Sequence, residues 1–148
     1  MADIEAIKKT ARERAKELKL SYTGALLPKE AHELMRSGVK LVDVRTRPEL
    51  EYVGSIPGSA FVEWETYPGS KRNVAFLEQL SAAVPTNEPV MFICRSGARS
   101  HHSAAAAAQA GWAESYNVLE GFEGKKDANG HRNTVEGWRV AGLPWKQG

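Results

Sequence analysis

The hydrophobic residues of this chain follow two spacings, one helical and one typical of buried strands. Apolar residues recur every three or four positions over residues 3–18, which predicts an amphipathic helix with Asp3 as its N-cap. Similar spacing predicts helices over residues 28–37, 73–80, 100–110 and 135–141, and a short helical turn over 49–52. Short apolar runs predict strands over residues 39–44, 60–62, 90–93 and 116–119. Strands separated by helices are typical of an α/β fold with a mostly parallel sheet.

The composition is that of one globular domain. The chain has 148 residues, of which 42% are hydrophobic and 26% charged, and we find no repeat or low-complexity linker. The net charge of +2 is too small to predict a nucleic-acid partner. The longest apolar stretch consists of the alanines at 104–108, so no membrane span is expected. The first residues mix acids with bases and lack a leader pattern, and the single cysteine cannot form an internal disulfide, so a cytoplasmic location is expected.

That cysteine, Cys94, is the candidate for chemistry. It follows the apolar run 90–93, and ligands of parallel sheets bind beyond the carboxyl ends of the strands. Gly97 lets the following loop curl so that its N–H groups point inward, and the guanidinium groups of Arg95 and Arg99 add positive charge. These groups favour the thiolate over the thiol. A lone cysteine after a strand is often buried and inert, but the two arginines and the glycine favour a reactive one.

Three motifs resemble those of the rhodanese-like sulfurtransferases. The loop Cys94-Arg95-Ser96-Gly97-Ala98-Arg99-Ser100 is similar to the active-site loop of that family. The segments at 41–45 and 48–59 resemble its two upstream signatures, with Ser55 where many members have histidine, and 119–122 and 137–144 resemble its closing segments. The resemblance covers residues 22–146. It implies a single domain with a five-stranded parallel sheet flanked by helices, here a rhodanese-like domain at 22–148 preceded by an N-terminal amphipathic helical extension at 1–21.

The resemblance also implies a sulfurtransferase. The thiolate of Cys94 would take the sulfane sulfur of thiosulfate or a similar donor as a persulfide, and cyanide or a thiol would then accept it. The backbone N–H groups of the substrate-binding loop would stabilise the persulfide, and Arg95 and Arg99 would hold the anionic donor; the loop residues are Arg95, Ser96, Gly97, Ala98 and Arg99. We expect Asp43 and Arg45 to support the site as a structural ion pair, together with Ser100. No metal or organic cofactor is required.

Other functions stay open at this point. A persulfide carrier that hands sulfur to a protein acceptor, or a regulatory rhodanese-like binding module, would show the same loop with little turnover. A phosphatase or arsenate reductase is less consistent with the sequence, because such phosphatases place five residues between cysteine and arginine, and here only residues 95–98 intervene. An arsenate reductase would also need a second cysteine. The basic segment 123–133 is expected to be a loop bordering the site entrance, either solvated or used to recognise a donor or partner.

Overall fold

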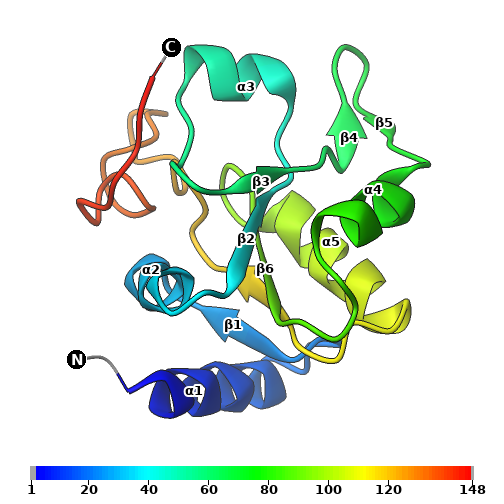
Figure 1. Ribbon diagram of the computed structural model, residues 1–148. Helices are drawn as coiled ribbons and strands as arrows, with labels where there is room; N and C mark the ends of the chain where they lie inside the picture. The colour runs from blue at the N-terminus through cyan, green and yellow to red at the C-terminus, as the bar shows by residue number, and fades with distance from the viewer. Residues whose placement is uncertain (1–2, 148) are drawn as a thin grey trace.

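A five-stranded parallel sheet forms the centre of the protein (Figure 1). The computed structural model describes residues 3–147. The strand order is β1-β7-β6-β2-β3, and every neighbouring pair is parallel. The strands are β1 (Gly24–Leu26), β2 (Lys40–Asp43), β3 (Ala60–Phe61), β6 (Val90–Ile93) and β7 (Ser115–Val118). The predicted α/β fold with a five-stranded parallel sheet in one domain is confirmed.

Helices cover both faces of this sheet. They are α1 (Ile4–Glu17), α2 (Pro28–Arg36), α3 (Arg47–Tyr52), α4 (Phe76–Ala83) and α5 (Ala98–Gln109). Helices α4 and α5 pack on one face, and α1 and α2 pack on the other (Figure 1). Helix α3 lies beyond the carboxyl end of the sheet, beside a small antiparallel hairpin of β4 (Glu65–Thr66) and β5 (Lys71–Arg72).

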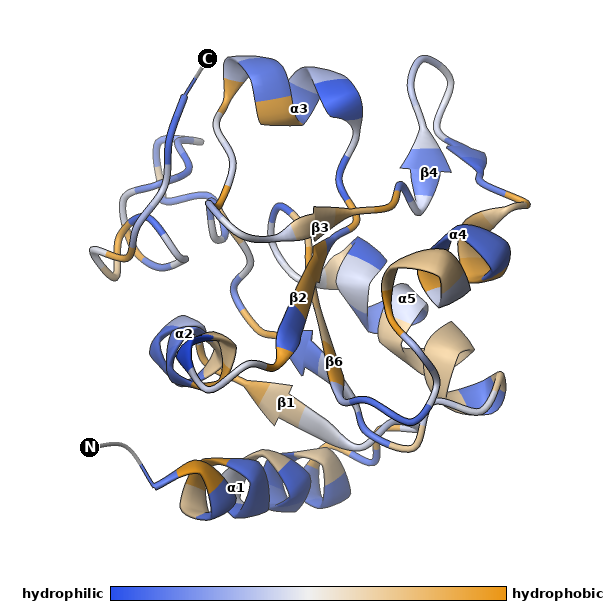
Figure 2. Cartoon of the chain, in the orientation of Figure 1, coloured by the Kyte–Doolittle hydropathy of each residue, from blue (hydrophilic) through white to orange (hydrophobic). Residues whose placement is uncertain are grey.

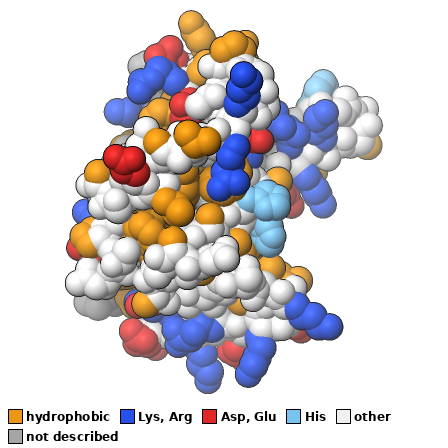
Figure 3. Space-filling view, turned by 90° about the vertical axis from the view of Figure 1, so that its right-hand side faces the viewer, with side chains coloured by type: hydrophobic (Ala, Val, Ile, Leu, Met, Phe, Trp, Pro, Cys, Tyr) orange, Lys and Arg blue, Asp and Glu red, His pale blue; other side chains and the backbone are white. Residues whose placement is uncertain are grey.

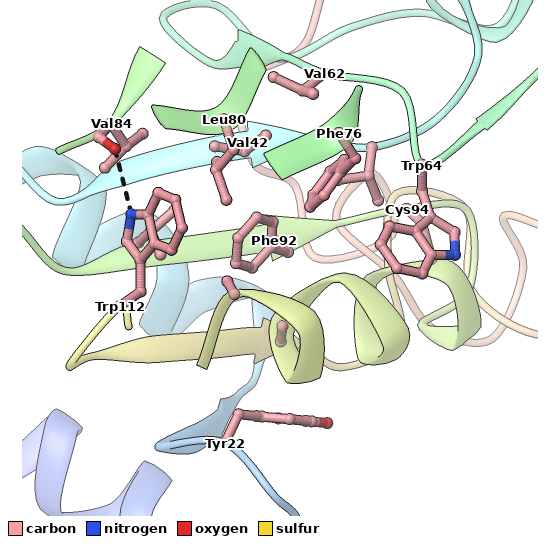
Figure 4. Packing of buried hydrophobic residues seen from close by; sticks show 14 residues of the cluster. Tyr22, Val42, Val62, Trp64, Phe76, Leu80, Val84, Phe92, Cys94 and Trp112 are labelled. Carbon is pink, nitrogen blue, oxygen red and sulfur yellow. Dashed lines mark hydrogen bonds between the residues drawn. The ribbon is translucent and has the colours of Figure 1, made fainter. Parts of the chain in front are cut away.

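The core follows from the alternation of side chains along the two central strands. In β6, Val90 and Phe92 face α4 and α5, whereas Met91 and Ile93 face the opposite layer with α2. All four residues are fully buried, which explains the continuous apolar run in the sequence. Figure 2 shows hydrophobic colouring along β6 and over part of β2, and Figure 4 shows aromatic side chains filling the layer on the α4 side. In that layer the Trp112 indole donates a hydrogen bond to the Val84 carbonyl at 3.2 Å.

The helix predicted over residues 135–141 is wrong. The chain forms consecutive turns there, with Gly137 and Gly142 in left-handed conformations at φ 114° and 78°. The Gly137 N–H donates to the Glu120 carboxylate, and the Trp138 N–H donates to the Gly121 carbonyl. An α-type bond from the Ala141 N–H to the Gly137 carbonyl is present at 2.9 Å, but the left-handed glycines limit it to a single turn. The contacts with the segment after β7 hold this turn in place, and Trp138 is fully buried in the core.

Other boundaries also differ from the sequence prediction. Helix α4 starts at Phe76 rather than Asn73, because the Asn73 side chain accepts a hydrogen bond from Ala75 and forms a turn. Helix α5 starts at Ala98 rather than Ser100, directly after Gly97. Strand β1 and the β4–β5 hairpin were not predicted, since segments of two or three residues carry no readable periodicity.

The surface is mixed in character. Within residues 3–147, every helix is too short or too polar to cross a bilayer. On the side that bears α4 and α5, hydrophobic side chains are exposed among basic ones (Figure 3). The large exposed hydrophobic residues include Tyr67, Val74 and Leu77.

Candidate active site

Cys94 lies where the central strand ends and the chain turns towards α5. It directly follows β6, which has β2 and β7 as its neighbours, so the cysteine sits at the middle of the carboxyl edge of the sheet. Its side chain is 1% exposed and contacts the hydrophobic cluster that contains Phe92 and Trp64 (Figure 4). The sulfur is thus almost fully enclosed by the protein.

Two polar groups contact the sulfur from the loop that follows it. The Gly97 N–H donates a hydrogen bond to Sγ at 3.1 Å, and the Ser100 hydroxyl lies 3.3 Å from Sγ. Gly97 has φ 112°, a conformation that favours glycine and turns its N–H towards the cysteine. The first-turn N–H groups of α5, which have no helical acceptors, begin at Ala98 beside the sulfur. The loop therefore offers a partly positive environment to an anion on Sγ.

Arg99 is brought next to Cys94 but is already paired. Its two terminal nitrogens donate to the two carboxylate oxygens of Glu49 at 2.7 and 2.9 Å. Burial alone would raise the pKa of Glu49, but hydrogen bonds and charge from Arg99, with further bonds from Thr46, lower it to about 2. Burial acts to lower the pKa of Arg99, and the Glu49 carboxylate outweighs it, so that pKa is raised. Sequence reasoning missed Glu49 as the partner, because the two residues are 50 positions apart.

The remaining residues of the predicted binding loop lie towards the cleft or the solvent. Arg95 is exposed and Ser96 is half-buried, while Ala98 is exposed at the start of α5. Arg95 and Arg99 line a cleft of about 880 Å³ above the loop. Its walls come from α3 and Thr46, from the β4–β5 hairpin with Tyr67, and from the predicted entrance segment 123–133.

Asp43 and Arg45 form a fully buried ion pair at the end of β2. Arg45 Nη2 lies 2.7 Å from Asp43 Oδ2, Arg45 Nε lies 3.0 Å from Oδ1, and both side chains are 0% exposed. Arg45 also donates to the Gly54 carbonyl at 2.8 Å and stacks over the Phe122 ring at 4.3 Å. The pair ties β2 to the turn after α3 and to the segment after β7. It does not contact Sγ.

The segment after β7 is bonded directly to the backbone of the cysteine loop. The Phe122 N–H donates to the Cys94 carbonyl at 2.8 Å, and Glu123 and Gly124 donate to the Arg95 carbonyl at 2.9 and 3.1 Å. A side chain at Gly121 would approach this backbone to 2.6 Å, so only glycine allows the contact. One cleft wall is therefore fixed relative to Cys94.

The two histidines of α5, His101 and His102, have partners close by. His101 Nδ1 is hydrogen-bonded to the Tyr22 hydroxyl at 2.8 Å, and the His101 and His102 rings stack edge to face at 5.2 Å. In the described part of the chain, no three histidine, cysteine, aspartate or glutamate side chains cluster as metal ligands would.

These features define a class of protein. A cysteine at the carboxyl edge of a parallel sheet, held by the N–H of a glycine loop and the start of a helix, is an arrangement for a nucleophilic sulfur that carries or transfers an anionic group.

Comparison with known proteins narrows this class to one family. The model of the rhodanese-like domain matches residues 27–128. The crystal structure of Rv0390 from M. tuberculosis is 42% identical in sequence, with a TM-score of 0.79, and the match covers 86% of this chain and 99% of that one. An uncharacterised protein of Rickettsia rickettsii is 34% identical over 112 residues, which are 72% of this chain and 81% of the relative. Thiosulfate sulfurtransferase 18 of Arabidopsis thaliana is 31% identical over 111 residues, again 72% and 81%.

The chain belongs to the rhodanese-like family, as its loop motif indicated. Its distant relatives include named thiosulfate sulfurtransferases, which supports a sulfurtransferase-like enzyme at the level of the family.

Proposed function

We propose that the protein is a sulfurtransferase that moves sulfane sulfur from thiosulfate or a similar anionic donor to a thiol or cyanide through a persulfide on Cys94. The observation that carries this proposal is the environment of Sγ, with the Gly97 N–H at 3.1 Å and the Ser100 hydroxyl at 3.3 Å. Both groups can donate to an anionic sulfur on a buried cysteine, and the loop that follows it contributes Arg95 and Arg99 to the lining of the cleft.

In the first step, the Cys94 thiolate attacks the outer sulfur of the donor. A bond forms between Sγ and that sulfur, and the bond between the two donor sulfurs breaks. With thiosulfate, sulfite leaves with the bonding electron pair, and the enzyme holds Cys94-S-S⁻. Arg95, exposed at the cleft floor, supplies positive charge for the dianionic donor. Arg99, which the sequence predicted to hold the donor, is paired with the Glu49 carboxylate instead, so the two together add little net charge.

In the second step, an acceptor thiolate or cyanide attacks the terminal sulfur of the persulfide. The bond between this sulfur and Sγ breaks, and Cys94 leaves as the thiolate, ready for another cycle. No proton has to be moved by a strong base. Asp43 and Arg45 then support the loop through the fold, and Ser100 supports it by contact with Sγ and with the Gly97 carbonyl.

Intact-protein mass spectrometry tests this proposal. The reduced protein is incubated with thiosulfate, freed from the excess donor and weighed beside Cys94→Ser, a matched control because Cys94 is the only cysteine. We expect a gain of one sulfur atom, about 32 Da, that disappears on adding cyanide and is absent in the variant.

Each other outcome is informative. A gain with an organic persulfide but not with thiosulfate would overturn thiosulfate as the donor and favour a dedicated persulfide carrier. No gain with either donor would overturn the persulfide mechanism and leave a binding module.

A further inference from the structure

The cleft that Arg95 and Arg99 line, next to the loop that follows Cys94, is much larger than an inorganic anion requires. Its volume of about 880 Å³ falls in the range of roughly 300–1,000 Å³ that is typical of sites for organic ligands. Three separate parts of the chain form the walls, so a substrate larger than thiosulfate would contact groups away from the sulfur. The charges on these walls indicate its chemistry.

Basic side chains dominate the wall formed by residues 123–133. Lys126 and Arg132 line the cleft there, with Arg95 at its floor, and none of the three forms an ion pair within residues 3–147. Arg132 donates one N–H to the Gly124 carbonyl at 2.8 Å, which fixes its guanidinium group at the wall. The segment also has two acids: Glu123 lines the cleft, whereas the Asp127 carboxylate accepts hydrogen bonds from within the loop. On this side of the cleft the three lining cations therefore exceed the one lining acid in charge.

Elsewhere in the cleft, Arg99 faces two acids: Glu49 is paired with it, and the negative charge of Glu65 on the hairpin acts on it as well. The lining cations Arg95, Arg99, Lys126 and Arg132 exceed the lining acids Glu49, Glu65 and Glu123 by one charge. The positive side of the cleft is therefore the one with Arg95, Lys126 and Arg132.

This wall is organised before any ligand binds. The Asp127 carboxylate accepts hydrogen bonds from the backbone N–H groups of Asn129 and His131, both at 2.9 Å, and from the Thr134 hydroxyl at 2.8 Å. The Asn133 N–H donates to the Glu123 carbonyl at 2.8 Å and closes the loop at its base. Because the preceding residues 122–124 are bonded to the Cys94 and Arg95 carbonyls, the backbone that carries Lys126 and Arg132 has a set position relative to Cys94.

We propose that Lys126 and Arg132 form a subsite for the carboxylate of a small organic thiol or persulfide whose sulfur reacts at Cys94. This proposal rests on the proposed function, because the thiol bound at the subsite takes its sulfur from the Cys94 persulfide. The acceptor thiolate attacks the terminal sulfur of the Cys94 persulfide, and Cys94 leaves as the thiolate. The organic persulfide forms while its carboxylate is bound at Lys126 and Arg132, and it then dissociates. The subsite selects among thiols by charge and takes no part in bond making.

Three thiols with the same two-carbon spacer and end groups of different charge test the subsite. The Cys94 persulfide is loaded, freed from donor and mixed with 3-mercaptopropionate, 2-mercaptoethanol or cysteamine, and its loss is followed by mass. Each rate in a variant is divided by the wild-type rate for the same thiol, which cancels the intrinsic reactivity of the thiol. For Lys126→Gln and for Arg132→Gln we expect the 3-mercaptopropionate rate to fall about two- to fivefold, with little change for 2-mercaptoethanol. Lys126→Glu should additionally raise the cysteamine rate, and added salt should reduce these differences.

Lys125→Gln is the matched control, because Lys125 carries the same charge next to Lys126 but is exposed outside the cleft. Equal responses of all three thiols, or an equal loss in Lys125→Gln, would overturn the subsite while the persulfide mechanism stands.

A second readout does not depend on sulfur transfer. Iodoacetate carries a carboxylate and iodoacetamide does not. The rate at which iodoacetate alkylates Cys94, divided by the rate for iodoacetamide, should therefore fall in Lys126→Gln. An unchanged ratio would overturn the subsite even if no persulfide forms.

Discussion

The Asp43–Arg45 ion pair is the part of the fold that we expect to be most sensitive to the loss of one charge. Asp43→Asn keeps the size of the side chain but removes its negative charge. The Arg45 guanidinium then stays buried with the Gly54 carbonyl and the Phe122 ring as its remaining partners. Arg45→Met leaves the Asp43 carboxylate unpaired in the same site.

The magnitude follows from burial. Both side chains are 0% exposed, so water cannot replace the lost partner, and breaking such a pair from one side costs about 3–5 kcal/mol. This is a large fraction of the roughly 5–15 kcal/mol by which a domain is stable. Removing both charges together leaves no buried ion, so the double variant Asp43→Asn/Arg45→Met should lose much less than the sum of the single losses.

Urea unfolding followed by tryptophan fluorescence measures these free energies, since Trp64, Trp112 and Trp138 are buried. The control is Glu33→Gln, which breaks the exposed Arg36–Glu33 pair and should cost less than about 1 kcal/mol. The reasoning is refuted if Asp43→Asn costs no more than the control, or if the two single losses simply add in the double variant.

Three further predictions concern the residues around the cysteine. The pKa of Glu49 is about 2 in the folded protein and near 4.5 in the unfolded chain, so the ionised carboxylate stabilises the fold above pH 4.5. The wild type should therefore be more stable than Glu49→Gln at pH 7, and this difference should disappear as the pH falls from 4.5 towards 2. We expect this advantage to be about 1–2 kcal/mol after solvent screening, measured by urea unfolding across pH; an advantage that persists at pH 2 would contradict the assignment. Gly97→Ala should lower the free energy of unfolding by about 1–2 kcal/mol, because alanine is strained at a φ of 112°. It should also slow persulfide loading by on the order of tenfold or more, because the N–H moves away from Sγ; an unchanged loading rate would show that this donor is dispensable. Gly121→Ala should destabilise by about 1–3 kcal/mol and lower activity, because its new methyl group meets the Arg95 backbone at 2.6 Å, and a fully stable, active variant would disprove the close contact.

The parts of the fold predictable from the sequence are those determined by local patterns. The apolar run 90–93 indicated a buried central strand, and this strand in turn placed Cys94 at the carboxyl edge of the sheet. The predicted pairing of Asp43 with Arg45 is present, since the two residues are close in sequence and face one way. The catalytic and binding roles assigned to the loop stay predictions.

What the sequence did not reveal depends on contacts between distant segments. The spacing of residues 135–141 is compatible with a helix, but the N–H groups of Gly137 and Trp138 find acceptors on the segment after β7. The Glu49–Arg99 pair likewise joins α3 to α5 across the cleft. No local periodicity encodes such contacts, because either partner alone is compatible with several environments.

The hydrogen bonds from residues 122–124 to the Cys94 and Arg95 carbonyls have a consequence for the order in which the protein is made. The ribosome produces Cys94 well before residues 122–124, which are bonded to its loop. Strand β1 also has to wait for β7, its partner from more than eighty residues later. A nascent chain that has emerged only as far as α5 therefore contains Cys94 but neither β7 nor residues 123–133. We expect the loop at Cys94 to reach its final geometry only once these segments have been added.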